Sequence, residues 1–323
     1  MKRLMTLLLA MVVVMGMMTS CTKDETAPEV TTFEKLTTYM SDQSMDLPDV
    51  LTSWLISASS LVGHESDYFI VDIRTAALFA EGHIEGAYNC PTISEIVDFV
   101  GTNNTNMLPV VIACYTGQSA CRAVVALRLS GYSDAQSLGF GMSSWNSSLD
   151  RWTSSCTSNG VGHANWSMDA PPALPNFTDE PLLECTATDD EGILAERVAY
   201  MLAKTDWGIN NTDVLAGPET YAVFNYWGAT DYTAYGHIAG AYQLTPSPSA
   251  LKIAENGLSM LDPVGTNVVY CWTGQTSSMV TAWLDLLGYD VKSLKFGANI
   301  MIYSQLQAHK WLGSADYPLV TGS

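Results

Sequence analysis

Two blocks of sequence occur twice in this chain, in the same order, and this repeat constrains the fold more than any other feature. Residues 81–88 return as residues 235–242, a spacing of 154, and six of the eight positions are identical. Residues 110–119 are echoed by residues 267–276. The repeat indicates a duplicated domain. A length of 323 residues agrees with this, because single hydrophobic cores stop growing at roughly 250–300 residues.

The pattern within each copy predicts the fold class. Short apolar runs such as residues 110–113 predict buried strands, whereas residues 120–130 and 277–287 have the length and apolar spacing of helices. Alternating strands and helices predict an α/β fold in which each domain is a parallel sheet with helices on both faces. Functional groups are expected at the carboxyl ends of such strands, where Cys114 and Cys271 stand.

The start of the chain resembles the signal of a bacterial lipoprotein. Lys2 and Arg3 precede an apolar run over residues 4–18, and small residues lead into Cys21. The resemblance implies export, cleavage before Cys21, a lipid on its thiol and a place in the cell envelope, on the periplasmic or surface face, with Thr22 favouring the outer membrane. The alternative is a membrane-spanning helix, but about fifteen apolar residues are short of the roughly 20 that a bilayer requires.

The stretch between the two copies contains four prolines, which disfavour regular elements and suit a semi-rigid connection. We therefore place the boundary between the domains in this stretch. The predicted organisation is a signal peptide at 1–20, a lipidated tether at 21–32, a first domain at 33–159, a Pro-rich linker at 160–191 and a second domain at 192–323.

The net charge of the chain limits the classes of partner that it is expected to bind. Lys and Arg number 14 against 33 Asp and Glu, a net charge of −19, so nucleic acid is not an expected partner and membrane contact is expected only through the lipid. With 47% hydrophobic and 15% charged residues, the chain has the composition of a globular protein.

In both copies a cysteine ends an apolar strand, and small or polar residues follow before a helix begins. Backbone N–H groups of such a loop and the positive end of the helix dipole stabilise a thiolate. The sequence therefore predicts thiol pKa values below the free value of about 8.5 at Cys114 and Cys271. Gly117 and Gly274 suit a tight turn. The alternative, a buried structural cysteine, leaves the Thr-Gly-Gln shared by both loops unexplained.

These motifs resemble those of tandem rhodanese-like domains. The first copy has Asp72-Ile73-Arg74 after a strand, then residues 82–87, the cysteine loop, and residues 138–141 before Trp145. The resemblance covers about residues 32–152 and 192–311, most of the mature chain. It implies that both predicted domains are rhodanese-like.

The resemblance also implies a sulfurtransferase. The loop cysteine would attack the outer sulfur of a small donor (thiosulfate, mercaptopyruvate or polysulfide), become a persulfide, and pass that sulfur to a thiol or cyanide. No metal and no organic cofactor is implied. Carried over by position, the nucleophiles are Cys114 and Cys271, and the residues that cradle the persulfide and the donor are Tyr115, Thr116, Gly117, Gln118, Ser119, Ala120, Trp272, Thr273, Gly274, Gln275, Thr276 and Ser277.

The second copy departs from the family pattern, because Asn225 and Trp227 stand where the first copy has Asp72 and Arg74. The second domain has therefore lost an ion pair. Neither loop carries a cation, so donor and acceptor stay open. The alternative function is a non-catalytic rhodanese-like binding or scaffold lipoprotein of the cell envelope, tied to a redox or chalcogen-oxyanion system.

The other cysteines and the histidines carry weaker expectations. Cys156 and Cys185 flank the linker, and in an exported protein they can form a disulfide that closes it. Cys121 is a candidate resolving thiol, with simple packing as the alternative. His83 and His237 lie in the repeated Gly-His-Ile turn and are expected to be structural. The histidines form no spacing typical of zinc ligands.

Overall fold

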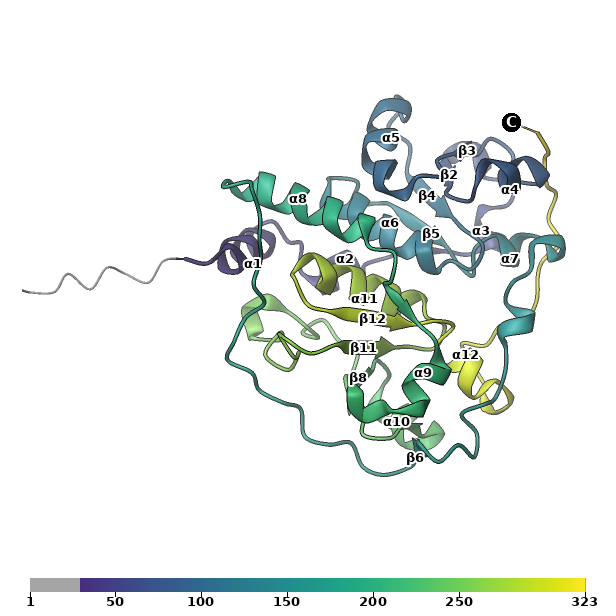
Figure 1. The fold of residues 1–323 in the computed structure, drawn as a ribbon. Coiled ribbons are helices and arrows are strands. Elements are labelled where there is room, and N and C mark those ends of the chain that lie inside the picture. The colour runs from purple at the N-terminus through teal and green to yellow at the C-terminus, as the bar shows by residue number, and fades with distance from the viewer. Residues whose placement is uncertain (1–29, 323) are drawn as a thin grey trace, which may run out of the picture. The chain divides into compact units, whose positions relative to one another are not determined.

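The computed structural model describes residues 30–322 (Figure 1). The predicted signal peptide, most of the tether and Cys21 lie outside the described residues, so the lipidation expected there stays a prediction. Residues from Thr31 onward form one compact unit that contains both copies of the repeat. In this part of the chain no helix combines the length and the apolar character that a bilayer span requires.

The first half holds a five-stranded parallel sheet with the order β1-β5-β4-β2-β3. Its central strands, β2 and β4, are buried along their whole length, as their continuous apolar sequence predicts. The five strands are β1 (Leu55–Ile56), β2 (Phe69–Asp72), β3 (Tyr88–Asn89), β4 (Val110–Ala113) and β5 (Gln136–Leu138).

The second half repeats this topology with the order β7-β12-β11-β8-β10. The α/β fold with two parallel sheets flanked by helices is therefore confirmed. The strands are β7 (Gly208–Ile209), β8 (Ala222–Asn225), β10 (Tyr242–Gln243), β11 (Asn267–Tyr270) and β12 (Val291–Leu294); a separate antiparallel pair joins β6 (Trp166–Ser167) to β9 (His237–Ile238).

Helices cover both sheets and separate them (Figure 1). The helix after each cysteine loop begins two residues earlier than the sequence indicated, because a left-handed glycine directly precedes it. The first half contains α1 (Thr32–Asp42), α2 (Leu47–Val50), α3 (Ala58–Leu61), α4 (Ala76–Glu81), α5 (Ile96–Asn103), α6 (Gln118–Leu129) and α7 (Met142–Trp145); the second contains α8 (Asp190–Ala203), α9 (Asn211–Ala216), α10 (Ala229–Tyr235), α11 (Gln275–Leu286) and α12 (Ala298–Met301).

The two halves share one core. Helices α6, α8 and α11 pack against one another, and a single cluster of buried apolar side chains draws members from both halves. Inside it, Asp285 accepts hydrogen bonds from Arg122 at 3.1 Å and Lys204 at 2.7 Å, with the carboxylate only 1% exposed. Asp285 therefore links α6 and α8 to its own helix, α11, with both cations paired to it.

The end of the chain returns to the first half. Val320 pairs with His83 in an antiparallel bridge, and Trp145 donates its indole N–H to the carbonyl of Pro318 at 2.7 Å. Between β6 and α8 the predicted linker contains no helix or strand, and Figure 1 shows it as a long extended connection. The exact domain boundaries stay predictions.

Candidate active site

Both predicted nucleophiles lie at the carboxyl end of a central strand. Cys114 follows β4, and its Sγ accepts hydrogen bonds from the backbone N–H groups of Gly117 at 3.1 Å and Ala120 at 3.4 Å. Cys271 follows β11, and its Sγ accepts from the N–H of Ser277 at 3.3 Å. Each sulfur therefore sits in a curl of backbone amides at the start of a helix, the geometry expected from the sequence.

The predicted lowering of the Cys114 pKa is wrong. Only 6% of Cys114 is exposed, and burial raises the pKa of its thiol above the ordinary value. Hydrogen bonds from the backbone of Ala120, Thr116, Gly117 and Ser119 lower it again, but only in part. The sequence reveals the amides, but it does not reveal that the loop is buried at the contact between the halves.

A second segment in each half fixes the shape of the loop. The N–H of Met142 donates to the carbonyl of Cys114 at 2.7 Å, and Gly141 before it has a φ of 62°. In the second half the N–H of Ala298 donates to the carbonyl of Cys271 at 3.0 Å, after Gly297 with a φ of 54°. A Cβ on either glycine would overlap with the carbonyl oxygen of the cysteine. These positions therefore require glycine.

Each cysteine loop also binds the turn after β5 or β12 of the other half, in a reciprocal arrangement. Gln118 accepts a hydrogen bond from the backbone N–H of Phe296 at 2.9 Å, and Gln275 accepts one from that of Phe140 at 2.7 Å. Gln118 also donates to the hydroxyl of Thr116 at 3.1 Å. Both glutamines are predicted to bind substrate, and in this structure each occupies the space beside the loop of the other half.

The remaining predicted loop residues divide by exposure. Those that are partly open to solvent, and so accessible to a small molecule, are Tyr115, Thr116, Ser119, Trp272, Thr273 and Thr276; those that are buried are Gly117, Ala120, Gly274 and Ser277.

Two arginines lie beside the first loop, and one of them is exposed. The guanidinium groups of Arg74 and Arg151 lie over the ring of Tyr115, at 5.1 Å and 4.7 Å from its centroid. Arg74 is held by Asp72 at 2.6 Å, whereas Arg151 is exposed. Arg151 belongs to no motif and lies far along the chain from the loop, so no pattern in the sequence indicates that its side chain lies beside Tyr115.

The surroundings of the second loop are aromatic. The ring of Trp272 stacks between Trp227 at 4.2 Å and His309 at 5.2 Å. Where the first half has its Asp72–Arg74 ion pair, the second has Asn225, which donates to the hydroxyl of Tyr270 at 2.8 Å. The loss of the ion pair expected from the sequence is confirmed, and an uncharged aromatic stack takes its place.

The disulfide considered between Cys156 and Cys185 is not formed, since both are free thiols. Cys156 lies near Asp150 and Lys310, whereas Cys185 packs against the shared core beside α8, so the two cysteines have different surroundings. Cys121 is fully buried in α6, and burial raises the pKa of its thiol well above the ordinary value, which favours packing.

His83 and His237 have structural surroundings, stacked on Phe79 and Tyr232 respectively. Over residues 30–322 no group of His, Cys, Asp and Glu is arranged to hold a metal ion.

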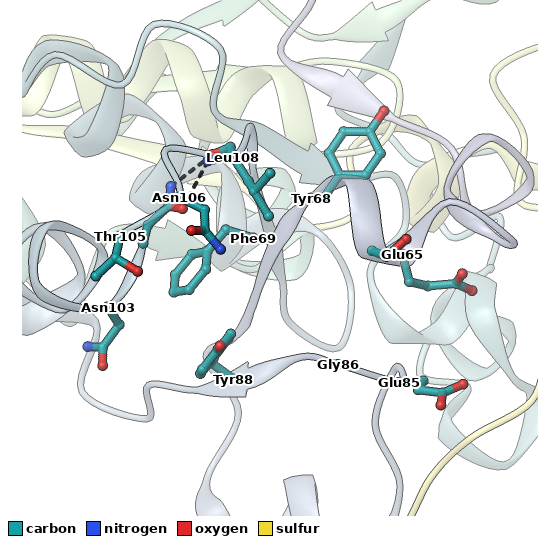
Figure 2. A pocket seen from close by; sticks show the side chains of 12 residues that line it. Glu65, Tyr68, Phe69, Glu85, Gly86, Tyr88, Asn103, Thr105, Asn106 and Leu108 are labelled. Carbon is teal, nitrogen blue, oxygen red and sulfur yellow. Dashed lines mark hydrogen bonds between the residues drawn. The ribbon is translucent and has the colours of Figure 1, made fainter.

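A cavity of about 410 Å³ lies at the amino ends of β2 and β4. Figure 2 shows the side chains that line it. Glu65 and Glu85 lie on one side of it, and Asn106 and Leu108 on the other. The cysteines follow the carboxyl ends of their strands, so this cavity lies at the opposite end of the first sheet. A second cavity, of about 780 Å³, includes Tyr226 in its wall.

Comparison with known proteins identifies the family. The sequence model described as Rhodanese-like domain matches residues 57–148. The chain is 37% identical over 81 residues to thiosulfate sulfurtransferase GlpE of Pseudomonas fluorescens, covering 25% of this chain and 72% of that protein. It is 38% identical over 77 residues to the protein of that name from Shewanella oneidensis, covering 24% and 74%. Among solved structures, the thiosulfate sulfurtransferase of Pseudomonas aeruginosa is 13% identical at a TM-score of 0.28, covering 89% of this chain and 48% of that one.

The matched segment contains β2, β4, the first cysteine loop and α6, and the second half repeats its motifs and strand order. The chain therefore belongs to the rhodanese-like family of sulfurtransferases.

Proposed function

We propose that this protein transfers sulfane sulfur through a persulfide on Cys114. The observation that carries the proposal is the cradle around this sulfur, in which N–H groups of Gly117 and Ala120 lie 3.1 Å and 3.4 Å from Sγ. N–H groups fixed in this way stabilise the negative charge of a thiolate, and equally that of a persulfide anion, without reorganisation during the reaction.

The transfer takes two displacement steps. The Cys114 thiolate attacks the outer sulfur of the donor, the bond from that sulfur to the rest of the donor breaks, and the leaving group departs with the electron pair. With thiosulfate the leaving group is sulfite. A thiol or cyanide then attacks the outer sulfur of the persulfide and releases the Cys114 thiolate. One neutral sulfur atom moves, so the reaction needs no external oxidant or reductant.

The surroundings of the first loop favour an anionic donor. Arg151 is exposed and places a positive charge beside Tyr115, directly after the nucleophile, whereas the charge of the buried Arg74 is balanced by Asp72. Cations at the mouth of a site raise the local concentration of anions. Thiosulfate, which the names of the curated relatives mention, is therefore the donor we propose for Cys114.

We assign Cys271 the role of a second sulfur carrier. Its sulfur accepts a hydrogen bond from the backbone N–H of Ser277, and the next residue, Trp272, stacks on Trp227. A site without cations is a poorer place for a dianion such as thiosulfate, so its substrates are expected to differ from those of Cys114.

We also propose that the protein is exported and held at the cell envelope, in the outer membrane, by a lipid on Cys21. The support is the signal-like sequence of Lys2, Arg3 and residues 4–18 before Cys21. Labelling cells with a tagged fatty acid tests this proposal. The wild-type chain should carry the label and a Cys21→Ala variant should not; label on both, or on neither, contradicts the assignment.

A binding or scaffold role is the second candidate function. It is favoured by the burial of Cys114, which raises the pKa of its thiol and so lowers the thiolate fraction at neutral pH. In this role the loops hold an anion or polysulfide without turnover.

One experiment separates the two functions. The reduced protein without residues 1–21 is incubated with thiosulfate or with 3-mercaptopyruvate, and intact mass spectrometry counts the sulfur atoms gained. Cys114→Ala, Cys271→Ala and the double variant assign them. Sulfur that is gained on Cys114 and then removed by cyanide or a thiol supports transfer. If the double variant gains and loses as much sulfur as the wild-type chain, transfer through these cysteines is contradicted. If neither the wild-type chain nor any variant gains sulfur, the binding role is favoured.

A further inference from the structure

The glutamines of the two cysteine loops, Gln118 and Gln275, hold corresponding places in the two halves. Each is the first residue of the helix that follows its loop, and these helices, α6 and α11, pack against each other (Figure 1). Gln118 is 3% exposed and Gln275 is 2% exposed, so the protein encloses both carboxamides. Their partners are therefore backbone groups of the protein, and a small molecule in solution has little access to them.

The side-chain oxygen of Gln275 contacts two segments of the first half. It accepts the N–H of Phe140, in the turn after β5, at 2.7 Å. It also lies against the α-carbon of Gly117, because a Cβ on this glycine would overlap with Oε1 of Gln275. Gly117 is the residue whose N–H donates to Sγ of Cys114 at 3.1 Å. One oxygen of the second half therefore touches both this turn and the part of the first loop that binds the sulfur.

The turn that Gln275 binds leads directly to the backbone of the nucleophile. Phe140 has a φ of 58°, a left-handed conformation that is unfavourable for a residue with a side chain. After Gly141, the N–H of Met142 donates to the carbonyl of Cys114 at 2.7 Å. The hydrogen bond to Gln275 stabilises a conformation that Phe140 would otherwise disfavour, and it thereby helps to fix Cys114.

The second half repeats this set of contacts. Gln118 accepts the N–H of Phe296 at 2.9 Å, and a Cβ on Gly274 would overlap with Oε1 of Gln118. Phe296 has a φ of 62°, and two residues later the N–H of Ala298 donates to the carbonyl of Cys271 at 3.0 Å. The same contacts thus occur twice, once in each direction between the halves, which incidental packing of one side chain does not explain.

Aromatic rings hold the two turns against each other. The ring of Trp152 lies 4.9 Å from that of Phe140 and 5.0 Å from that of Phe296, and Trp311 lies 5.3 Å from Phe140, between centroids. The indole of Trp152 also donates to the carbonyl of Thr116, in the first loop, at 3.2 Å. Both turns and the first loop therefore belong to one packed cluster, to which the glutamines add the polar contacts.

We propose that each glutamine is a positioning residue for the cysteine of the opposite half, Gln275 for Cys114 and Gln118 for Cys271. The proposal rests on the sulfur transfer proposed above, and it adds that each half completes the geometry of the nucleophile in the other. Because the carboxamides are buried among backbone groups, they act on the rate at which the bound donor reacts and not on the affinity for the donor.

The test uses the Cys271→Ala chain, in which only Cys114 reacts and the second loop has no sulfur chemistry of its own. Persulfide formation is followed over a range of thiosulfate concentrations by rapid quenching and intact mass spectrometry. We expect Gln275→Ala to lower the rate at saturating thiosulfate about tenfold and to keep the half-saturating concentration within about twofold. A glutamine that served only the substrates of Cys271 would change neither value.

Two further variants separate the hydrogen bond from the packing of the side chain. Gln275→Met keeps the length of the side chain and loses the accepting oxygen, so it should be as slow as Gln275→Ala. Gln275→Glu keeps an oxygen that accepts a hydrogen bond, so it should recover most of the rate.

Asn267→Ala is the matched control for stability. Asn267 is also a buried carboxamide of the second half, and it donates to the carbonyl of Asp262 at 2.8 Å, but it lies at the amino end of β11, opposite the cysteine. Its loss should destabilise the fold without changing the rate at Cys114. The reciprocal experiment uses the Cys114→Ala chain with polysulfide as the donor, where Gln118→Ala should slow the loading of Cys271 by a similar factor.

The outcomes distinguish this inference from the proposed function. A rate that Gln275→Ala leaves within about twofold of the parent overturns the positioning role while sulfur transfer stands. Equal slowing by Asn267→Ala overturns it as well, and so does a higher half-saturating concentration at an unchanged rate, which would assign Gln275 to donor binding.

If the parent chain takes up no sulfur, the proposed function fails, and alkylation of Cys114 by iodoacetamide at one fixed pH decides the inference separately. A rate that Gln275→Ala changes by at least about fivefold, and Asn267→Ala does not, supports the positioning role. Equal alkylation rates in these two variants overturn it.

Discussion

Replacing Gly141 with alanine tests whether the backbone around Cys114 sets the reaction rate. Gly141 has a φ of 62° and a ψ of −156°, a region that essentially only glycine adopts. A Cβ there would lie 2.6 Å from the nitrogen of Gly117 and overlap with the carbonyl oxygen of Cys114. Ordinary contacts of a Cβ begin at 3.4 Å, so the Gly117 nitrogen must retreat by about 0.8 Å and the Cys114 carbonyl oxygen by more.

Gly131 offers a matched control, because its φ of 99° is also positive but a Cβ there meets nothing within 4 Å. Gly131→Ala should lower the free energy of unfolding by about 1–2 kcal/mol through backbone strain alone. Gly141→Ala adds the displacement of the loop. A misplacement of about 1 Å in a reacting group can cost on the order of 100-fold in rate, so we expect a loss of this size at Cys114.

Both variants are made with Cys271→Ala, so that only Cys114 reacts. Transfer of sulfur from thiosulfate to cyanide gives the rate, and urea unfolding gives the stability. Gly131→Ala should keep its rate within about twofold of the parent, whereas Gly141→Ala should lose about 100-fold under conditions where it is still folded. Equal rates in the two folded variants would refute the reasoning that the glycine contact holds the reactive geometry.

Three further predictions follow from buried or charged groups. The Asp285→Asn variant leaves Arg122 buried without its counter-charge, so the free energy of unfolding, measured by urea titration, should fall by about 3–5 kcal/mol. A fall of less than about 1 kcal/mol would contradict the central role of this carboxylate. Alkylation of Cys114 by iodoacetamide, followed by peptide mass spectrometry, should accelerate only at a higher pH than alkylation of free cysteine, because burial raises the pKa of the Cys114 thiol. Because the pKa of the Cys114 thiol is higher in the folded protein, this thiol contributes its full stabilisation below the unfolded pKa of about 8.5, and the contribution is lost as the pH rises through the folded pKa. Rapid alkylation of Cys114 at pH 7 would contradict the raised pKa and therefore this pH dependence. Arg151→Ala should raise the KM for thiosulfate at Cys114 about tenfold, Arg151→Lys should restore most of it, and neither should affect Cys271.

The repeated motifs predicted the α/β class, the two sheets and the place of both cysteines, because strand ends and left-handed glycines are local features of sequence. The reciprocal bonds of Gln118 and Gln275 were not predicted. Each joins residues more than 130 positions apart, and such pairs leave no spacing that a single sequence reveals. The direction of the Cys114 pKa was wrong for a related reason, since the burial that raises it depends on packing between the halves.

The exchange of glutamine side chains also bears on how such a chain can evolve. Gln118 accepts a hydrogen bond from the N–H of Phe296 in the second half, and Gln275 accepts one from that of Phe140 in the first, so each half satisfies a backbone amide of the other. A gene fragment that encoded a single half would expose the shared core and leave the amide of Phe140 or Phe296 without the side chain that satisfies it. The halves can differ in the surroundings of their loops, as they do at Arg74 and Trp227, whereas the reciprocal glutamine bonds require both halves to be present.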